Sequence, residues 1–334
     1  MRAPGYLALG ALLVGCAGPL VEDCAHGNLD QRYCDANGDL VADPPGDPRM
    51  LLDPDRLIFA YTPVEDPAQF RDVWAGFLAH LEKAVSRDVL FFPVQSNSAQ
   101  IEAMRAGRLH IAGFNTGSVP LAVNCAGFVP TTMMARADGS FGYEMEILTH
   151  RESGIESVPE LRGRTLAFTS PTSNSGFKAP SVLLESEFGL VADQDFEPAF
   201  SGRHDNSVLG VLQRDYDAAA VANIVIDQVL ARGVGSRDDL RVLYRSETFP
   251  TTAYGVSNRL DSDLAEAVIE AFYTFDWEGS ALDAEFEESS FIPISYEGHW
   301  EVIRRIDVAS GTSWRCRWAC ALDELGIPVS GHRP

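Results

Sequence analysis

The stretch "RLIFAYTP" (residues 56–63) decides the fold, because it opens a regular alternation of strands and helices. Its apolar residues predict a strand that ends in a turn. The next segment, "FRDVWAGFLAHLEKAV" (70–85), repeats apolar residues at helical spacing. A predicted strand at 89–94, a helix at 98–107 and a strand at 109–114 follow. This β-α-β-α-β order, with short connections, predicts a parallel sheet covered by helices.

A second series of strands and helices begins at "YEMEILTH" (143–150). The amphipathic helix predicted at 260–275, capped by Asp261 or Ser262, can return to the first series. We therefore predict an α/β protein with two lobes. The predicted boundaries are 56–142 with 254–306 for lobe 1, 143–253 for lobe 2 and 307–334 for a C-terminal tail. Ligands of such sheets bind beyond the carboxyl ends of strands, which places the predicted site in the cleft between the lobes.

The composition is that of an acidic globular protein. The 334 residues are 46% hydrophobic and 22% charged, and the formal net charge is −22. A surface this acidic repels nucleic acid and anionic lipid headgroups, so neither is an expected partner. It does not attract small anions either. Any anion site must therefore work through short-range hydrogen bonds.

The N-terminal segment "MRAPGYLALGALLVGC" (1–16) carries one Arg and then an apolar run. The run is too short to span a bilayer as a helix and fits the apolar region of a signal peptide. Its end, Leu13 to Cys16, resembles a bacterial lipobox, in which the cysteine becomes the lipidated first residue. We expect an exported lipoprotein that is attached to a membrane through Cys16. The alternative is an ordinary cleaved signal with a chance cysteine.

Five cysteines remain in the expected mature chain, at positions 24, 34, 125, 316 and 320. Export favours disulfides, and an odd count leaves one cysteine over. We favour pairing of the tail cysteines, Cys316 and Cys320, with the N-terminal Cys24 and Cys34. Two local pairs are the alternative. Cys125 is the expected unpaired cysteine.

Residues 17–55 are rich in Asp, Pro and Gly and predict a tether or a small ordered extension. Within "YCDANGDLVADPP" (33–45), four side chains take positions 1, 3, 5 and 9 of an EF-hand-like loop. They are Asp35, Asn37, Asp39 and Asp43. Leu40 replaces the expected Gly, and Gly46 replaces the bidentate Glu at position 12. A solvated acidic linker is the default interpretation, and a partial loop that binds a structural calcium ion is the alternative.

The segment "FTSPTSNSGFKAP" (168–180) carries the strongest chemical signal. Hydroxyl and amide side chains cluster between the end of a strand and a helix that opens near Gly176. Unpaired backbone N–H groups at a helix start, with hydroxyls beside them, can bind an anion without Lys or Arg. The alternative is a simple helix cap, which needs only one such residue. Polar residues also follow two other strand ends, with His204 and Ser207 in "SGRHDNSVLG" (201–210) and Asn115, Thr116 and Ser118 in "HIAGFNTGSVP" (110–120).

The run "DGSFGYE" (138–144), followed by "SPTSNSGFKAP" and "SGRHDNSVLGV", resembles the PhnD-like phosphate, phosphite and phosphonate-binding proteins of bacterial ABC transporters. The resemblance covers about residues 56–306. It implies a two-lobed periplasmic-binding-protein-like fold (type II) that closes on its ligand, and an ABC permease as partner of a monomeric protein. It also implies a set of ligand-binding residues: Tyr143, Ser173, Asn174, Ser175 and His204, with Asn115, Thr116 and Thr252 as further candidates. Thr251 and Tyr254 are additional possible donors.

Departures from the family pattern limit the ligand. Phe114 stands where aminoalkylphosphonate binders carry a Tyr that lines the pocket. The acidic residues that would hold a ligand's amino group are absent, with Ile224 and Thr251 or Thr252 at the corresponding places. We therefore expect phosphite, phosphate or a small alkylphosphonate rather than an aminophosphonate, and no cofactor.

Two other functions are considered. Cys125 as a thiolate could bind arsenite, as in sensor relatives that report to a kinase. A hydrolase is the remote alternative, because His204 and Asp205 lie near serines. However, the sequence has no nucleophile elbow, zinc signature or P-loop. We expect a binding protein and not an enzyme.

Overall fold

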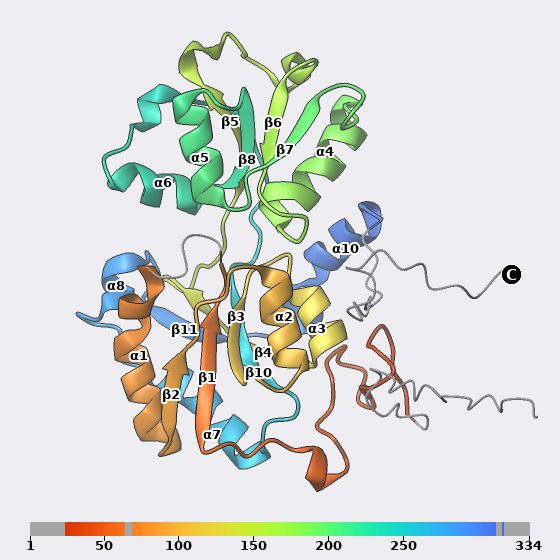
Figure 1. The fold of residues 1–334 in the computed structure, drawn as a ribbon, viewed down its shortest axis with the longest axis vertical. Helices are drawn as coiled ribbons and strands as arrows, with labels where there is room; N and C mark the ends of the chain where they lie inside the picture. The colour runs from red at the N-terminus through yellow and green to blue at the C-terminus, as the bar shows by residue number, and fades with distance from the viewer. Residues whose placement is uncertain (1–23, 64–68, 312–315, 317–334) are drawn as a thin grey trace, which may run out of the picture.

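Two mixed β-sheets with helices on both faces form the two lobes of the protein, which lie one above the other in Figure 1. The structure is a computed structural model, and it describes residues 24–63, 69–311 and 316. The predicted signal segment and Cys16 lie outside these residues. Within the described part of the chain, no helix is both long and apolar enough to cross a membrane.

Lobe 1 contains a six-stranded sheet in the order β11-β4-β10-β3-β1-β2. Strands β1 (Arg56–Tyr61), β2 (Asp88–Phe91) and β3 (Ile111–Phe114) are parallel, as the sequence predicts. Strand β10 (Ala253–Ser257) returns from the other lobe and runs antiparallel between β3 and β4 (Phe128–Ala135). Strand β11 (Ser290–Pro293) completes the edge beside β4.

Helices cover both faces of the lobe 1 sheet. One face carries α1 (Phe70–Val85), α7 (Ser262–Tyr273) and α8 (Ala281–Glu285). The other carries α2 (Asn97–Arg105) and α3 (Val119–Ala126). The predicted apolar stripe of α1 is buried at Phe70, Trp74 and Phe77, and Asp261 caps α7 as expected. Sequence reasoning did not predict α3 or β4.

Lobe 2 contains a five-stranded sheet in the order β7-β6-β8-β5-β9. Its strands are β5 (Met145–His150), β6 (Thr165–Phe168), β7 (Glu197–Phe200), β8 (Ala218–Ala222) and β9 (Leu240–Arg245). Its α-helices are α4 (Ala179–Phe188), α5 (His204–Gln213) and α6 (Asn223–Ala231). A single π-helical turn, Asn174–Lys178, leads directly into α4. The strand end and the helix start that frame the polar cluster are therefore as predicted.

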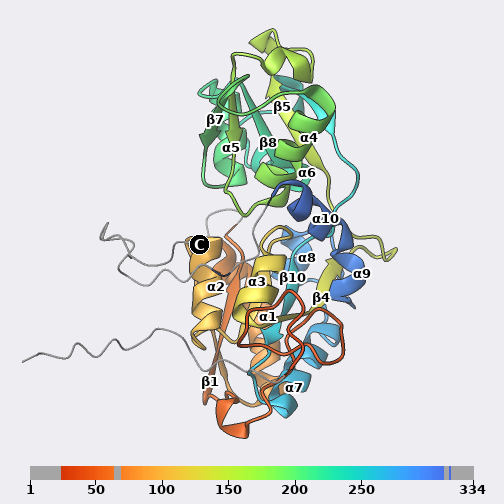
Figure 2. The ribbon, with the colours of Figure 1, turned by 90° about the vertical axis from the view of Figure 1, so that its right-hand side faces the viewer.

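The lobes are joined by two crossing segments, 136–144 and 246–252, which run side by side (Figure 1). Backbone hydrogen bonds pin them together at one point, where Tyr143 N–H donates to Phe249 O at 3.0 Å and Phe249 N–H donates to Tyr143 O at 2.8 Å. The chain then ends in α9 (Tyr296–His299) and α10 (Glu301–Ala309). Figure 2 shows α10 beside the junction of the lobes, where it contacts α4 and the π-helical turn.

The N-terminal extension, residues 24–55, packs against lobe 1 rather than extending into solvent. Leu29 and Tyr33 are buried in the lobe 1 core. The Asn258 side-chain amide donates to Asp43 O at 2.8 Å, and a backbone bridge joins Leu52 to Leu260. The default prediction of a solvated linker is therefore wrong for this part, and the ordered extension is correct. A few apolar side chains were enough to anchor a segment whose composition is that of a linker.

The acidic residues of the extension make local hydrogen bonds. Asp43 accepts one from the backbone N–H of Ala36 at 2.7 Å, and Asp39 accepts one from the Asn37 amide at 2.9 Å. The Asp35 side chain is 5% exposed. Among the described residues, no group of three or more His, Cys, Asp or Glu side chains is placed to hold a metal ion. Calcium binding by this loop stays a prediction.

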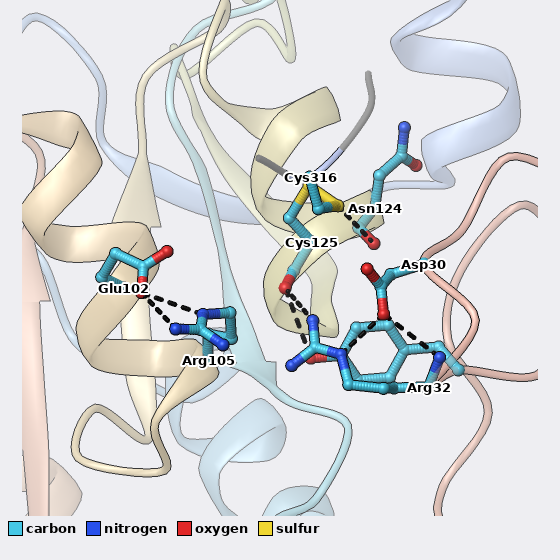
Figure 3. The surroundings of a disulfide bond; sticks show 8 residues. Asp30, Arg32, Glu102, Arg105, Asn124, Cys125 and Cys316 are labelled. Atoms are coloured by element: carbon cyan, nitrogen blue, oxygen red, sulfur yellow. Dashed lines mark hydrogen bonds and ion pairs between the residues drawn. A yellow bond between two sulfur atoms is a disulfide. The ribbon is translucent and has the colours of Figure 1, made fainter. Parts of the chain in front are cut away.

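Two disulfide bonds fix the extension and the tail, Cys24–Cys34 and Cys125–Cys316. Figure 3 shows Cys316 bonded to Cys125 on α3, and Arg32 of the extension reaching the same helix. The Arg32 guanidinium donates to Cys125 O at 3.0 Å. Helix α3 therefore receives contacts from both ends of the described chain.

The cysteine predictions require a correction. Cys125 is paired and not free, and Cys24 and Cys34 pair with each other rather than with the tail. Spacing along the chain does not show which cysteines the fold brings together. A disulfide-bonded sulfur is not a thiolate, so the predicted arsenite site at Cys125 is wrong as well. Cys320 lies outside the described residues.

Candidate functional site

A small cavity of about 70 Å³ lies between the two lobes. All eight residues that the sequence nominated as ligand-binding line it: Asn115, Thr116, Tyr143, Ser173, Asn174, Ser175, His204 and Thr252. The volume is far below the roughly 300–1,000 Å³ of pockets for drug-sized ligands. The cavity therefore suits a ligand of a few heavy atoms.

The helix start after β6 supplies donors from lobe 2. Ser173 caps the π-helical turn, and its Oγ accepts the backbone N–H of Gly176 at 3.0 Å. The N–H groups of Asn174 and Ser175 are in the first turn, where a helix offers no carbonyl partner. Ser173, Asn174 and Ser175 are all at least nine-tenths buried. A ligand here would meet backbone and side-chain donors that water does not screen.

His204, the first residue of α5, is a neutral donor. The backbone N–H of Ala222 donates to its Nδ1 at 3.1 Å, so Nδ1 is an acceptor and the ring proton is on Nε2. Nε2–H lies 3.2 Å from Ser173 Oγ and donates to it. Burial lowers the pKa of His204 to about 4, so the ring is uncharged near neutral pH. Because Ser173 Oγ already accepts two hydrogen bonds, its own O–H is available to a ligand.

Tyr143 stands where the two crossing segments meet, and its hydroxyl reaches the same helix start. The hydroxyl oxygen accepts the Asn174 side-chain amide at 3.4 Å and also interacts with Ser175 and Thr116. Burial raises the pKa of the Tyr143 phenol, and these hydrogen bonds oppose the shift in part. The phenol is therefore protonated and can donate its O–H.

The loop after β3 brings lobe 1 to the cavity. Asn115 Oδ1 accepts the backbone N–H of Ser118 at 3.0 Å, which shapes the loop. Thr116 Oγ1 donates to Pro250 O at 2.7 Å. Asn115 and Thr116 therefore use part of their hydrogen-bonding capacity to hold the loop, even though both line the cavity. The Gly117 backbone lies close to lobe 2, since a Cβ atom there would be 2.4 Å from Thr172 O.

Sequence reasoning missed the aromatic lining and misplaced two residues. Tyr61 at the end of β1, Phe70 at the start of α1 and Phe286 line the cavity. Tyr61 could have been nominated, because it ends a strand at the same edge as Asn115. Phe114 instead packs on Phe128, and the Tyr254 hydroxyl faces Met134 in the core, so neither lines the cavity. Both are in strands buried on both faces, where sequence does not show which face a residue takes.

The cavity contains no ionic partner among the described residues that line it, none of which is Lys, Arg, Asp or Glu. Ile224, Thr251 and Thr252, which the sequence places where an amino group would need acidic residues, all line the cavity. Further apolar contacts come from Ala222 and Val225. The described lining therefore offers an anion neutral donors and offers an ammonium group no carboxylate.

The geometry does not support Ser-His hydrolysis. A Ser-His pair needs a His nitrogen that can accept the serine proton, with the other nitrogen oriented by an acid. Nε2 of His204 carries a proton, and Nδ1 is bonded to a backbone N–H. The neighbouring Asp205 carboxylate instead lies 3.4 Å from Arg203 Nε and accepts the Asn206 backbone N–H. His204 donates to Ser173 Oγ and is not arranged as a general base.

A family model described as "ABC transporter, phosphonate, periplasmic substrate-binding protein" matches residues 59–299. The phosphate-import protein PhnD of Mycolicibacterium smegmatis is 24% identical over 261 residues, which are 75% of this chain and 81% of that protein. The phosphonates-binding periplasmic protein of Escherichia coli is 24% identical over 198 residues. That match spans 58% of each chain.

Solved structures share the fold. PhnD1 from Prochlorococcus marinus, in complex with methylphosphonate, superposes with a TM-score of 0.68 at 18% identity and covers 78% of this chain and 100% of its own. A binding-protein component of an ABC phosphonate transporter from Pseudomonas aeruginosa gives a TM-score of 0.68 at 18% identity, covering 78% and 87%. The predicted two-lobed periplasmic-binding-protein-like fold is confirmed.

Proposed function

This chain belongs to the family of periplasmic substrate-binding proteins of phosphonate ABC transporters, and we propose that it binds a small phosphorus oxyanion for uptake through an ABC permease. The proposed ligands are phosphite, phosphate and small alkylphosphonates. The protein binds and releases its ligand and does not turn it over. We also propose that it is exported, monomeric and anchored to a membrane through a lipid on Cys16.

One observation carries the proposal, namely that neutral donors converge on a buried cavity with no charged side chain in its described lining. Ser173 and Tyr143 each offer a polar hydrogen there, and the Nε2–H of His204 donates to Ser173 Oγ and so leaves the Ser173 O–H free for the ligand. Hydrogen bonds to a charged acceptor are stronger than neutral ones, and burial keeps water from competing for them. Such a set can bind an anion even though the protein as a whole carries a charge of −22.

The apolar part of the lining favours a ligand with one apolar substituent on phosphorus. Phosphite carries a P–H bond and an alkylphosphonate carries a P–C bond, and either can face Ile224, Val225 or Phe286. A fourth oxygen of phosphate in that position would lack a partner, at a cost of about 1–3 kcal/mol. We therefore expect phosphite or methylphosphonate to bind more tightly than phosphate. An aminoalkylphosphonate has no carboxylate partner in the described lining and should bind most weakly.

A thermal-shift panel of phosphite, phosphate, methylphosphonate, aminoethylphosphonate and sulfate tests the proposal. Phosphite or methylphosphonate should raise the melting temperature most, because a ligand that binds only the folded state stabilises it. If sulfate alone raised it, the phosphorus specificity would be wrong. If no oxyanion did, the proposed function would be wrong.

Ser175→Ala is expected to weaken binding of the strongest ligand of the panel at least tenfold. Ser175 is 2% exposed and lies at the helix start, so its hydroxyl can donate to the oxyanion. A hydrogen bond to a charged group contributes roughly 1.5–3 kcal/mol, and about 1.4 kcal/mol is a factor of ten. Isothermal titration calorimetry measures the affinity. Ser181→Ala is the control, because Ser181 lies outside the cavity on α4 and donates to Phe177 O. Equal affinities for wild type and Ser175→Ala would refute the site assignment.

A further inference from the structure

Two buried polar atoms of the cavity lining have no partner within the described structure: Thr251 Oγ1, whose hydroxyl can itself donate, and Asn174 Oδ1, which can only accept. Asn174 is 1% exposed, and its amide Nδ2 donates to the Tyr143 hydroxyl. Its Oδ1 makes no hydrogen bond within the described structure. Leaving a buried acceptor unpaired costs roughly 1–3 kcal/mol, so such an atom requires an explanation. Since Asn174 lines the cavity, a group on the ligand could supply the missing proton.

The neighbouring polar groups have hydrogens to offer, and Asn174 Oδ1 needs one. Ser173 Oγ accepts from Gly176 and His204, which leaves its own O–H as a donor. Tyr143 likewise accepts the Asn174 amide and keeps its O–H. A fully deprotonated oxyanion would accept these hydrogens and leave Oδ1 without a partner. A ligand that retains one P–OH group would satisfy both kinds of site.

We infer that Asn174 Oδ1 accepts the P–OH hydrogen of the ligand, so that the protein selects the singly protonated monoanion over the dianion. The inference rests on the proposed function and narrows it to one protonation state. Charge supports it as well, because moving a dianion from water into a buried site without a cation costs more than moving a monoanion. No cationic side chain lines the cavity among the residues described.

The titratable side chains around Asn174 keep the same charge near neutral pH. Their titration therefore does not produce the pH dependence expected from selection of the monoanion. The titratable lining groups are Tyr61, Tyr143 and His204. Burial raises the pKa of Tyr143 and lowers the pKa of His204 to about 4, so both are neutral. Lys178, on the same helical turn, points to Gly117 O and to Asp307 rather than to the amide. The ligand itself is left as the titrating group.

Calorimetric titration with inorganic phosphite between about pH 6 and pH 9 tests the inference. Phosphorus oxyanions lose their second proton near neutral pH, at about 6 for a phosphate monoester. Above the second pKa of phosphite, wild-type affinity should fall about tenfold per pH unit, and binding should take up about one proton. Proton uptake is obtained by comparing the heats of binding measured in buffers that differ in ionisation enthalpy. Hypophosphite, a monoanion with no P–OH to lose, should bind with constant affinity and serves as the control for titration of protein groups.

The Asn174→Thr variant tests whether Asn174, rather than another residue of the site, causes the pH dependence of phosphite affinity. A hydroxyl can donate as well as accept, so the variant should tolerate the dianion, and its loss of phosphite affinity should shrink to less than about threefold per pH unit. Phosphite affinity that is constant or rises with pH in the wild type would overturn the inference while leaving the proposed function intact. An unchanged tenfold slope in Asn174→Thr would overturn the role of this residue. Failure of every oxyanion to bind would instead count against the proposed function.

Discussion

Gly117→Ala is expected to lower ligand affinity about hundredfold while both lobes stay folded. A Cβ atom at this position would lie 2.4 Å from Thr172 O and 2.5 Å from Asn174 N, closer than real Cβ contacts. Both are backbone atoms of lobe 2, so no side-chain rotation can relieve the overlap. The lobes would have to separate, and a misplacement of about 1 Å in a positioned site can cost on the order of hundredfold. The variant therefore tests whether the closed arrangement is the ligand-bound state.

Calorimetry with the strongest oxyanion of the panel gives the affinity of Gly117→Ala, and small-angle X-ray scattering reports whether ligand still compacts the protein. Gly76→Ala is the matched control, because Gly76 is exposed on α1 and a Cβ there meets no atom within 4 Å. The control should bind as the wild type does. Wild-type affinity in Gly117→Ala would mean that the ligand is held in a more open arrangement than the one described.

The sequence predicted which polar residues meet in the cavity better than it predicted the residues around them. Asn115, Ser173 and His204 each follow a strand end, and the carboxyl ends of strands meet at the cleft in this class of fold. Because these strand ends meet at one edge, the location of the polar residues could be inferred before any contact was known. The same argument applies to Tyr61, which also ends a strand. However, an aromatic residue at that position is equally typical of the hydrophobic core.

What could not be predicted depends on tertiary contacts that leave no local pattern. Phe114 and Tyr254 are in short strands that are buried on both faces, so alternation does not reveal which side chains face the cleft. Helix α3 is eight residues long, apolar except for Asn124 and contains a proline, which hides its helical period. The pairing of Cys125 with Cys316 joins residues 191 positions apart, and only the folded chain brings them together.

The role of Lys178 also depends on tertiary contacts, because its side chain connects lobe 2, lobe 1 and α10. It is the last residue of the π-helical turn of lobe 2, and its Nζ donates to Gly117 O of lobe 1 at 2.7 Å. The same Nζ lies 2.7 Å from the carboxylate of Asp307 on α10. The two side chains are 5% and 0% exposed. Burial lowers the pKa of Lys178, and the charge of Asp307 opposes that shift.

Lys178→Met is expected to lower the free energy of unfolding by about 3–5 kcal/mol, because it removes the ammonium group from a buried carboxylate. The double variant Lys178→Met, Asp307→Leu should recover most of that loss, since apolar residues of similar volume can replace a buried ion pair. Urea unfolding followed by circular dichroism measures all three proteins. Arg56→Met is the control, because the Arg56–Asp88 pair is 55% and 67% exposed and such pairs contribute about 1 kcal/mol or less.

Binding measurements on the two variants also distinguish an effect on the stability of the fold from an effect on closure of the lobes. If the double variant regains stability but still binds the oxyanion weakly, the hydrogen bond from Lys178 to Gly117 O holds the lobes together independently of the ion pair. If it regains both, the contribution of Lys178 is confined to neutralising Asp307. A single variant as stable as the wild type would show that the buried carboxylate does not depend on Lys178, and the electrostatic account would then be wrong. Because Lys178 lies only three residues beyond Ser175, the π-helical turn and α10 are expected to respond together to closure of the lobes.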